Sequence, residues 1–85
     1  MIRRPVTIQS SMDMEERPIA HLVQEASQYS SKIYIELDEK RINAKSIMGM
    51  MSLKLTEGTN LVVAAEGEDE EMAVKGVEAF LVSDH

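Results

Sequence analysis

The stretch KIYIELDEKRIN, residues 32–43, carries the pattern that decides the fold. Apolar and polar residues alternate in its first half, with Ile33, Ile35 and Leu37 on one face, which is typical of a half-buried strand. The polar DEK that follows predicts a tight turn, and the RIN after it predicts a short returning strand. The stretch therefore predicts an antiparallel hairpin with one face turned toward a core.

Two further strands are predicted on either side of this hairpin. PVTIQ, residues 5–9, alternates with Val6 and Ile8 on the same face. NLVVAAE, residues 60–66, is more continuously apolar, which indicates a central position in the sheet.

The first predicted helix begins near Pro18, because a proline in the first turn loses no hydrogen bond there. It ends near QYSS, and its apolar stripe at helical spacing is Ile19, Leu22, Val23 and Ala26. A second, short helix follows Ser46, whose hydroxyl suits an N-cap, and Gly49 weakens it by about 1 kcal/mol relative to alanine. Leu53 ends this apolar segment.

A third helix is predicted after Asp69, a good N-cap residue. Glu70 and Glu71 are favourably placed near the positive end of the helix dipole. The stripe expected to be buried is Ala73, Val77, Phe80 and Leu81.

The resulting order of elements is β-α-β-β-α-β-α. We expect one α+β domain over residues 1–85, an open-faced β-sandwich in which helices cover one face of a four-stranded antiparallel sheet. A chain of this length buries about 60–65% of its unfolded surface, which suffices for one modest core but not for a deep substrate cavity.

Composition excludes several kinds of site. The chain has no cysteine, and its two histidines, His21 and His85, lie far apart, so we expect no metal and no cofactor. All of the net charge of −6 falls in residues 46–85, and such a surface repels phosphate backbones, which argues against direct nucleic-acid binding. No leader and no long apolar run is visible, so we expect no membrane association and a cytoplasmic protein.

Two motifs, SMDMEERP at 11–18 and NAKSIMG at 43–49, occur in the order found in a known family. With the element order, they make the chain resemble HPr, the small phosphocarrier of the bacterial sugar phosphotransferase system, over nearly its whole length. NAKSIMG is the specific signal. The segments VQEAS, NAKSIMGMMSL and GEDE are especially similar to an HPr-like paralogue of the carrier. The resemblance implies the same βαββαβα fold.

Carrier members begin the first helix with Gly-x-His-Ala-Arg-Pro, and the histidine accepts a phosphoryl group from Enzyme I. The matching residues here are 13–18, which retain Arg17 and Pro18 but have Glu15 at the histidine position. A carboxylate does not supply the reactivity of imidazole, and Glu16 beside it repels an incoming phosphoryl group. The resemblance therefore implies that carrier activity is lost and that the protein is not an enzyme.

The two glutamates have two readings, and the sequence does not choose between them. At a helix N-terminus each carboxylate gains about 0.3–1 kcal/mol from the dipole, and one can pair with Arg17. Alternatively, the permanent negative charge of Glu15 imitates a phosphorylated histidine and selects or blocks partners. We interpret His21, one turn past Arg17, as a solvent-exposed helix histidine rather than a replacement carrier.

The resemblance gives Ser46 a regulatory role. In the family a serine in the same KSIMG context is phosphorylated by the ATP-dependent HPr kinase/phosphorylase. A phosphate at that position adds about −1.5 to −2 charges where the helix N-terminus favours an anion. The alternative is that Ser46 serves only as an N-cap.

The short helix is too apolar to be buried completely. Met50 and Leu53 are expected in the core, which leaves Ile47, Met48 and Met51 as an exposed patch typical of a binding face. In the family the matching residues dock on CcpA, a LacI-type transcription regulator. The resemblance implies that the phosphoserine and Arg17 lie beside them.

The main hypothesis is a corepressor of CcpA in carbon catabolite repression, with Glu15, Arg17, Ser46, Ile47, Met48 and Met51 at the partner-binding surface. One alternative is a phosphocarrier that uses an unconventional residue. Another is an adapter for a different protein, which the extra carboxylates at Asp13 and Glu16 keep open. A homodimer formed by exchange of the N-terminal strand is also considered, although composition gives no preference.

Overall fold

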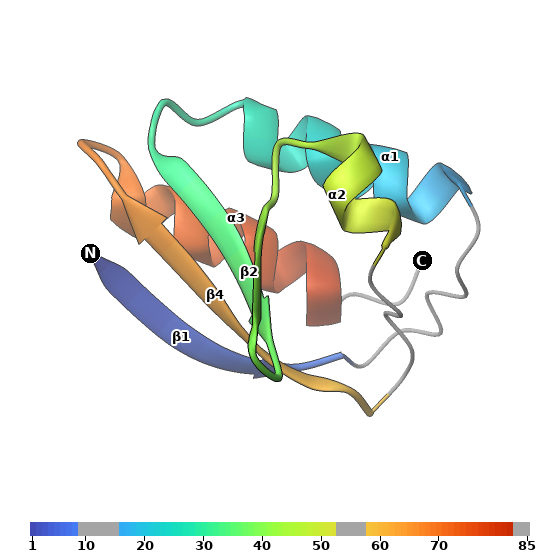
Figure 1. The fold of residues 1–85 in the computed structure, drawn as a ribbon. Coiled ribbons are helices and arrows are strands. Elements are labelled where there is room, and N and C mark those ends of the chain that lie inside the picture. Colours follow the sequence, from blue (N-terminus) through green and yellow to red (C-terminus); the bar gives the residue numbers. More distant parts are fainter. Residues whose placement is uncertain (9–15, 53–57, 83–85) are drawn as a thin grey trace.

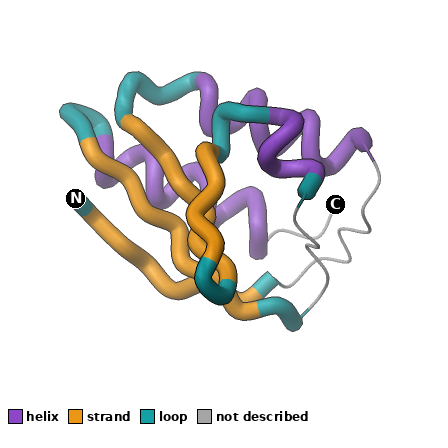
Figure 2. Tube along the Cα trace, viewed as in Figure 1, coloured by secondary structure: helices purple, strands orange, loops and turns teal. Residues whose placement is uncertain are grey.

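A computed structural model of the chain describes residues 1–8, 16–52 and 58–82, with the side chains of 16–18 left out. The elements are β1 (Ile2–Thr7), α1 (Glu16–Ser27), β2 (Lys32–Leu37), β3 (Lys40–Asn43), α2 (Ile47–Met51), β4 (Asn60–Glu66) and α3 (Glu70–Val82). The predicted α+β class and element order are confirmed. Figure 1 shows α1 and α3 along one face of the sheet, and Figure 2 shows the strands as one layer and the helices as another.

The four strands form one antiparallel sheet in the order β1-β4-β2-β3. Ala65 of β4 lies opposite Ile2 on one side and Ile33 on the other, so β4 is central, as its continuous apolar sequence predicted. β2 and β3 form the predicted hairpin, and Asp38 in its turn adopts a left-handed backbone conformation with φ of 56°.

The prediction for the first strand was wrong at its start. β1 begins at Ile2, three residues before the predicted Pro5. The reason is Arg4, which interrupts the apolar pattern on the inner side of the strand but is paired there with Glu78 of α3, at 2.9 Å. Ile8 follows the strand and is buried as predicted, whereas Gln9 lies outside the described residues.

The core lies between the sheet and the helices and contains most residues that the patterns predicted. Val23, Leu37 and Phe80 are only partly buried at its margin, and Val74, which the pattern of α3 did not predict, is 1% exposed. The predicted residues with exposures of 5% or less are Val6, Ile8, Ile19, Leu22, Ala26, Ile33, Ile35, Met50, Ala73, Val77 and Leu81.

Asp69 joins two loops at one end of the sheet. Its carbonyl oxygen accepts from the N–H of Ala73 at 2.9 Å, which places it at the predicted N-cap position of α3. Its carboxylate, however, accepts from the backbone N–H groups of Ser30 and Ser31, at 3.0 and 2.9 Å, and from the Ser31 hydroxyl. The carboxylate therefore holds the α1–β2 loop against the start of α3.

This junction also explains one glycine. A Cβ on Gly67 would lie 2.5 Å from the Ser31 Oγ and 2.7 Å from the Ser31 Cα, at a φ of 155°. Only a residue without a side chain allows the β4–α3 turn to approach the α1–β2 loop this closely.

Two further kinds of site can be assessed for the described residues alone. None of their helices is long and apolar enough to span a membrane. Among the same residues, no three His, Cys, Asp or Glu side chains gather in a way that could hold a metal ion.

Candidate docking site around Ser46

Ser46 stands where β3 ends and α2 begins. Asn43 shapes the turn, because its side-chain oxygen accepts from the N–H of Lys45 at 2.8 Å and its carbonyl accepts from the N–H of Ser46 at 3.0 Å. Ser46 has extended backbone angles, and its Oγ accepts from the N–H of Gly49 at 3.2 Å. The predicted N-cap is confirmed, and the Ser46 side chain is exposed to solvent.

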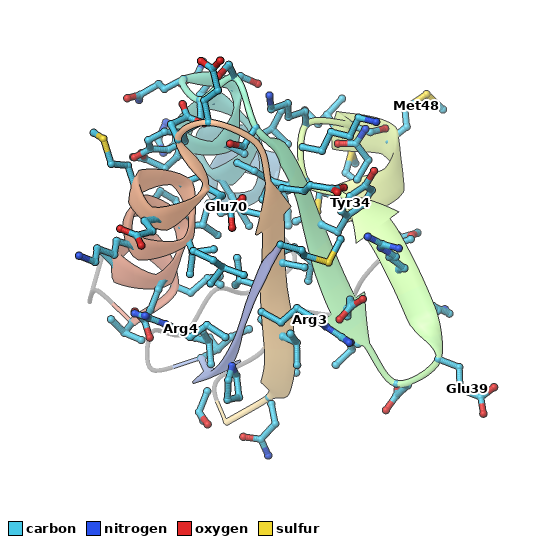
Figure 3. The ribbon with its side chains drawn as sticks, turned by 90° about the vertical axis from the view of Figure 1, so that its left-hand side faces the viewer. Arg3, Arg4, Tyr34, Glu39, Met48 and Glu70 are labelled. Carbon is cyan, nitrogen blue, oxygen red and sulfur yellow. The ribbon has the colours of Figure 1, made fainter. Side chains whose placement is uncertain are left out.

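The short helix α2 presents two different faces. Met50 points into the core and is fully buried. Ile47, Met48 and Met51 are 42%, 83% and 45% exposed, and we call these three residues the methionine patch. Figure 3 shows the Met48 side chain extending away from the rest of the protein. The predicted division of α2 holds for these four residues, whereas Leu53 lies outside the described residues.

Packing against β3 and α1 fixes the position of α2. A Cβ on Gly49 would lie 3.0 Å from Cγ2 of Ile42, so the glycine that weakens the helix also lets it lie close to β3. The helix ends at Met51 and is capped by Ser52, whose N–H and hydroxyl both donate to the carbonyl of Gly49, at 3.1 and 2.6 Å. These contacts hold the exposed face of α2 in a defined orientation.

The loop between α1 and β2 also contacts this region. The Nζ of Lys45 donates to the carbonyl of Tyr29 at 2.6 Å, which directs its charge to the C-terminal end of α1. The Tyr29 hydroxyl donates to Glu25 at 3.0 Å. Partial burial, followed by the hydrogen bond to this carboxylate, raises the pKa of the Tyr29 hydroxyl above its ordinary value.

The remaining predicted site residues are placed only in part. Arg17 belongs to the first turn of α1, but its side chain is outside the described set, as is that of Glu16. Asp13 and Glu15 lie outside the described residues altogether. His21 is exposed on α1, as predicted. The structure thus brings Ser46 and the methionine patch together, and the roles of Glu15 and Arg17 stay predictions.

Sequence reasoning missed a charged cluster on the open face of the sheet, opposite the helices. Glu36 accepts from Nε and Nη2 of Arg3, at 3.0 and 2.5 Å, and lies 3.7 Å from Nε of Arg41. The Arg41 guanidinium is 4.0 Å from the centre of the Tyr34 ring. Arg3 and Tyr34 are labelled in Figure 3. The alternation in β2 pointed to this polar face, but only the strand order shows which charges meet there.

Known proteins resemble this chain over nearly its whole length. A family model described as the PTS HPr component phosphorylation site matches residues 2–83. The chain belongs to the HPr family. The HPr-like protein Crh of Bacillus subtilis (strain 168) is 40% identical over 81 residues, which is 95% of each chain.

Solved structures of HPr-family proteins have the same fold. HPr-C-His from Thermoanaerobacter tengcongensis gives a TM-score of 0.88 at 42% identity, over 95% of this chain and 91% of that one. A crystal structure of Bacillus subtilis Crh, described as an intertwined dimer with a swapped domain, gives a TM-score of 0.76 at 40% identity, over 95% and 93% of the two chains. Because an HPr and a Crh are about equally similar to this chain, overall identity does not separate carrier from regulator.

Proposed function

We propose that this chain is a regulatory HPr-like protein that is phosphorylated on Ser46 by an HPr kinase/phosphorylase. The phosphorylated protein binds a CcpA-type transcription regulator as a corepressor in carbon catabolite repression. Such a function belongs in the cytoplasm. The observation that supports the proposal is the exposed hydroxyl of Ser46 directly beside the exposed methionine patch.

Phosphorylation at this position is compatible with the fold. Among the described residues, the Ser46 Oγ accepts one hydrogen bond, from the N–H of Gly49 at 3.2 Å, and a phosphate oxygen can accept in its place. The modification adds about −1.5 to −2 charges at an exposed position. Its main effect is therefore a change of surface potential beside the patch rather than a change of structure.

The methionine patch supplies the apolar centre of the proposed interface. Methionine side chains are flexible and polarizable, so they adapt to a partner surface. We assign Arg17 to the charged rim, where its guanidinium can pair with the phosphate or with acidic groups of the regulator. We assign Glu15 the position of the carrier histidine, which removes carrier activity. Both assignments rest on the matching family motif.

Intact-mass measurement and calorimetry together test the proposal. Incubation with HPr kinase/phosphorylase and ATP is expected to add one phosphate to Ser46 and to increase affinity for the regulator. The matched control is Ser46→Asn, because asparagine keeps an N-cap acceptor but cannot be phosphorylated. Absence of the phosphate, or equal affinity before and after phosphorylation, contradicts the proposal.

The alternatives give different results in the same assays. One alternative is a phosphocarrier like the HPr relatives, which would become labelled by phosphoenolpyruvate and Enzyme I; we expect no label. An adapter for another enzyme would retain its partner in the Ser46→Asn variant. Binding to the regulator only after phosphorylation would contradict both the carrier and the adapter.

We also propose that the chain can form a homodimer by exchanging β1. The contacts of this strand within the described structure include its ladder with β4, the ion pair of Arg4 with Glu78, the hydrogen bonds of Arg3 to Glu36 and the burial of Val6 in the core. Each of these contacts is equally satisfied when β1 comes from a second copy. The solved Crh dimer with its swapped domain supports the idea.

A further inference from the structure

We propose that Met48 and Met51 form a peroxide-sensitive modification site, and that their oxidation opposes docking at the methionine patch. The second part rests on the proposed function. Three methionines of α2 lie within four residues of sequence but differ completely in exposure, at 83% for Met48, 45% for Met51 and 0% for Met50. An oxidant in solution therefore has access to two of the three methionines.

The reaction is a two-electron oxygen transfer from hydrogen peroxide. The thioether sulfur attacks one peroxide oxygen, an S–O bond forms and the O–O bond breaks. The proton of the transferred oxygen moves to the departing hydroxide, so the products are a sulfoxide and water. The sulfur is oxidised and the peroxide is reduced, with no further reactant needed.

Oxidation at these positions changes the surface without disturbing the core. A sulfoxide is polar and chiral, and such a group disrupts methionine-rich interfaces. Met48 and Met51 lie outside the buried cluster that holds α2 in place, whereas Met50 belongs to it. The modification therefore makes two of the three side chains of the patch beside Ser46 polar, leaves Ile47 unchanged and leaves the anchor of the helix intact. It acts in the direction opposite to phosphorylation.

The chain contains its own control for oxidation elsewhere. Met72 is 66% exposed on α3, so it should be oxidised as well. Met72 belongs to α3, whereas the patch belongs to α2. Met12 and Met14 lie outside the described residues and are monitored by mass spectrometry alone.

The first test is the order of oxidation in the full-length protein. After brief exposure to hydrogen peroxide, peptide mass spectrometry is expected to find sulfoxide on Met48 and Met51 well before Met50. Oxidation of Met50 at the rate of Met48 overturns the assignment of the site. This measurement does not depend on any partner, so it stands whether or not the protein binds a regulator.

The second test is binding of the Ser46-phosphorylated protein to the regulator before and after peroxide. We expect the affinity for the regulator to fall about tenfold or more, because two side chains at the centre of the interface change from apolar to polar. Methionine sulfoxide reductases should restore it. Equal affinity before and after oxidation overturns the inference. If the reduced, phosphorylated protein does not bind at all, both the proposed function and the effect on docking are rejected.

Two variants assign any loss of affinity to the patch. In Met48→Leu/Met51→Leu, the ratio of affinities before and after peroxide is expected to be close to one, whatever the starting affinity. Met72→Leu should remain as sensitive as the natural sequence. If the double variant loses affinity as strongly as the unmodified chain, other methionines are responsible and the inference is wrong.

Discussion

At the scale of single residues, the carboxylate of Asp69 couples stability to pH. The hydrogen bond from the Ser31 hydroxyl, followed by those from backbone N–H groups, lowers the pKa of Asp69 below its ordinary value of 3.8. The unfolded chain therefore binds this proton more readily than the folded one. The stabilising contribution is complete above the ordinary pKa and is lost as pH falls through the lowered, folded-state pKa.

We expect Asp69→Asn to flatten this dependence. Between the lowered pKa and the region just above 3.8, the free energy of unfolding of the natural sequence should rise with pH more steeply than that of the variant. Urea unfolding at a series of acidic pH values measures the two slopes. Ser31→Ala removes the leading hydrogen bond and should give an intermediate slope. Equal slopes for all three proteins would show that Asp69 is not the group responsible.

Ser46 gives a second prediction at this scale, because its cap can be separated from its phosphorylation. Ser46→Ala should lower the free energy of unfolding by about 0.5–2 kcal/mol, since the N–H of Gly49 loses its acceptor. Ser46→Asn should lower it less. Denaturant unfolding of the three proteins checks the order. Identical stabilities would show that the hydroxyl contributes nothing to α2.

At the scale of the element, α2 combines an anchor and a free surface within five residues. Met50→Ala should lower the free energy of unfolding by about 2–5 kcal/mol, because it leaves a cavity in the core. Met48→Ala should change it by about 0.5 kcal/mol or less, because the side chain is largely in solvent. Guanidinium unfolding measures both. Similar losses for the two variants would contradict the assignment of the two faces.

Local patterns predicted the elements well where the burial of a side chain depends only on its position in its own helix or strand. The alternation of β2 and the stripe of α1 are confirmed, since a period of two or of 3.6 residues follows from backbone geometry. The patterns failed where a distant element changes what a residue needs. Arg4 is acceptable on the inner side of β1 only because α3 supplies Glu78, and the carboxylate of Asp69 binds a loop that is remote in sequence.

The same reasoning applies to the candidate site. The exposure of Ile47, Met48 and Met51 followed from the sequence, because a helix of one or two turns has too little circumference to bury every apolar residue. The packing that orients α2 did not follow, since the approach of Gly49 to Ile42 depends on the path of β3. Overall identity does not separate carrier from regulator either, because an HPr and a Crh are about equally similar to this chain.

At the scale of the whole molecule, β1 is an edge strand. Its contacts can be made equally by β1 of the same chain or by β1 of a second copy. Its ladder with β4 runs from Ile2 opposite Ala65 to Thr7 opposite Asn60. The N-terminal amine adds an ion pair with Glu70 of α3 at 3.4 Å, and Arg4 adds one with Glu78 at 2.9 Å. The proposed strand-exchanged dimer would satisfy the same contacts as a closed monomer, so its formation should depend on concentration.

The pair of Arg4 and Glu78 allows a direct test of strand exchange. Arg4→Glu alone places two carboxylates together, and Glu78→Arg alone places two guanidinium groups together. In an exchanged heterodimer of these two variants, both sites regain opposite charges. We therefore expect co-refolding of one isotope-labelled variant with the other to give heterodimers in excess of a random mixture, as counted by native mass spectrometry. Labelled and unlabelled natural chains, which gain nothing from mixing, should give a random mixture.

Each exposed pair contributes only about 0–1 kcal/mol, but the heterodimer gains two pairs and loses two repulsions relative to either homodimer. Monomers alone at every concentration, or a random mixture of the two variants, would exclude exchange of β1.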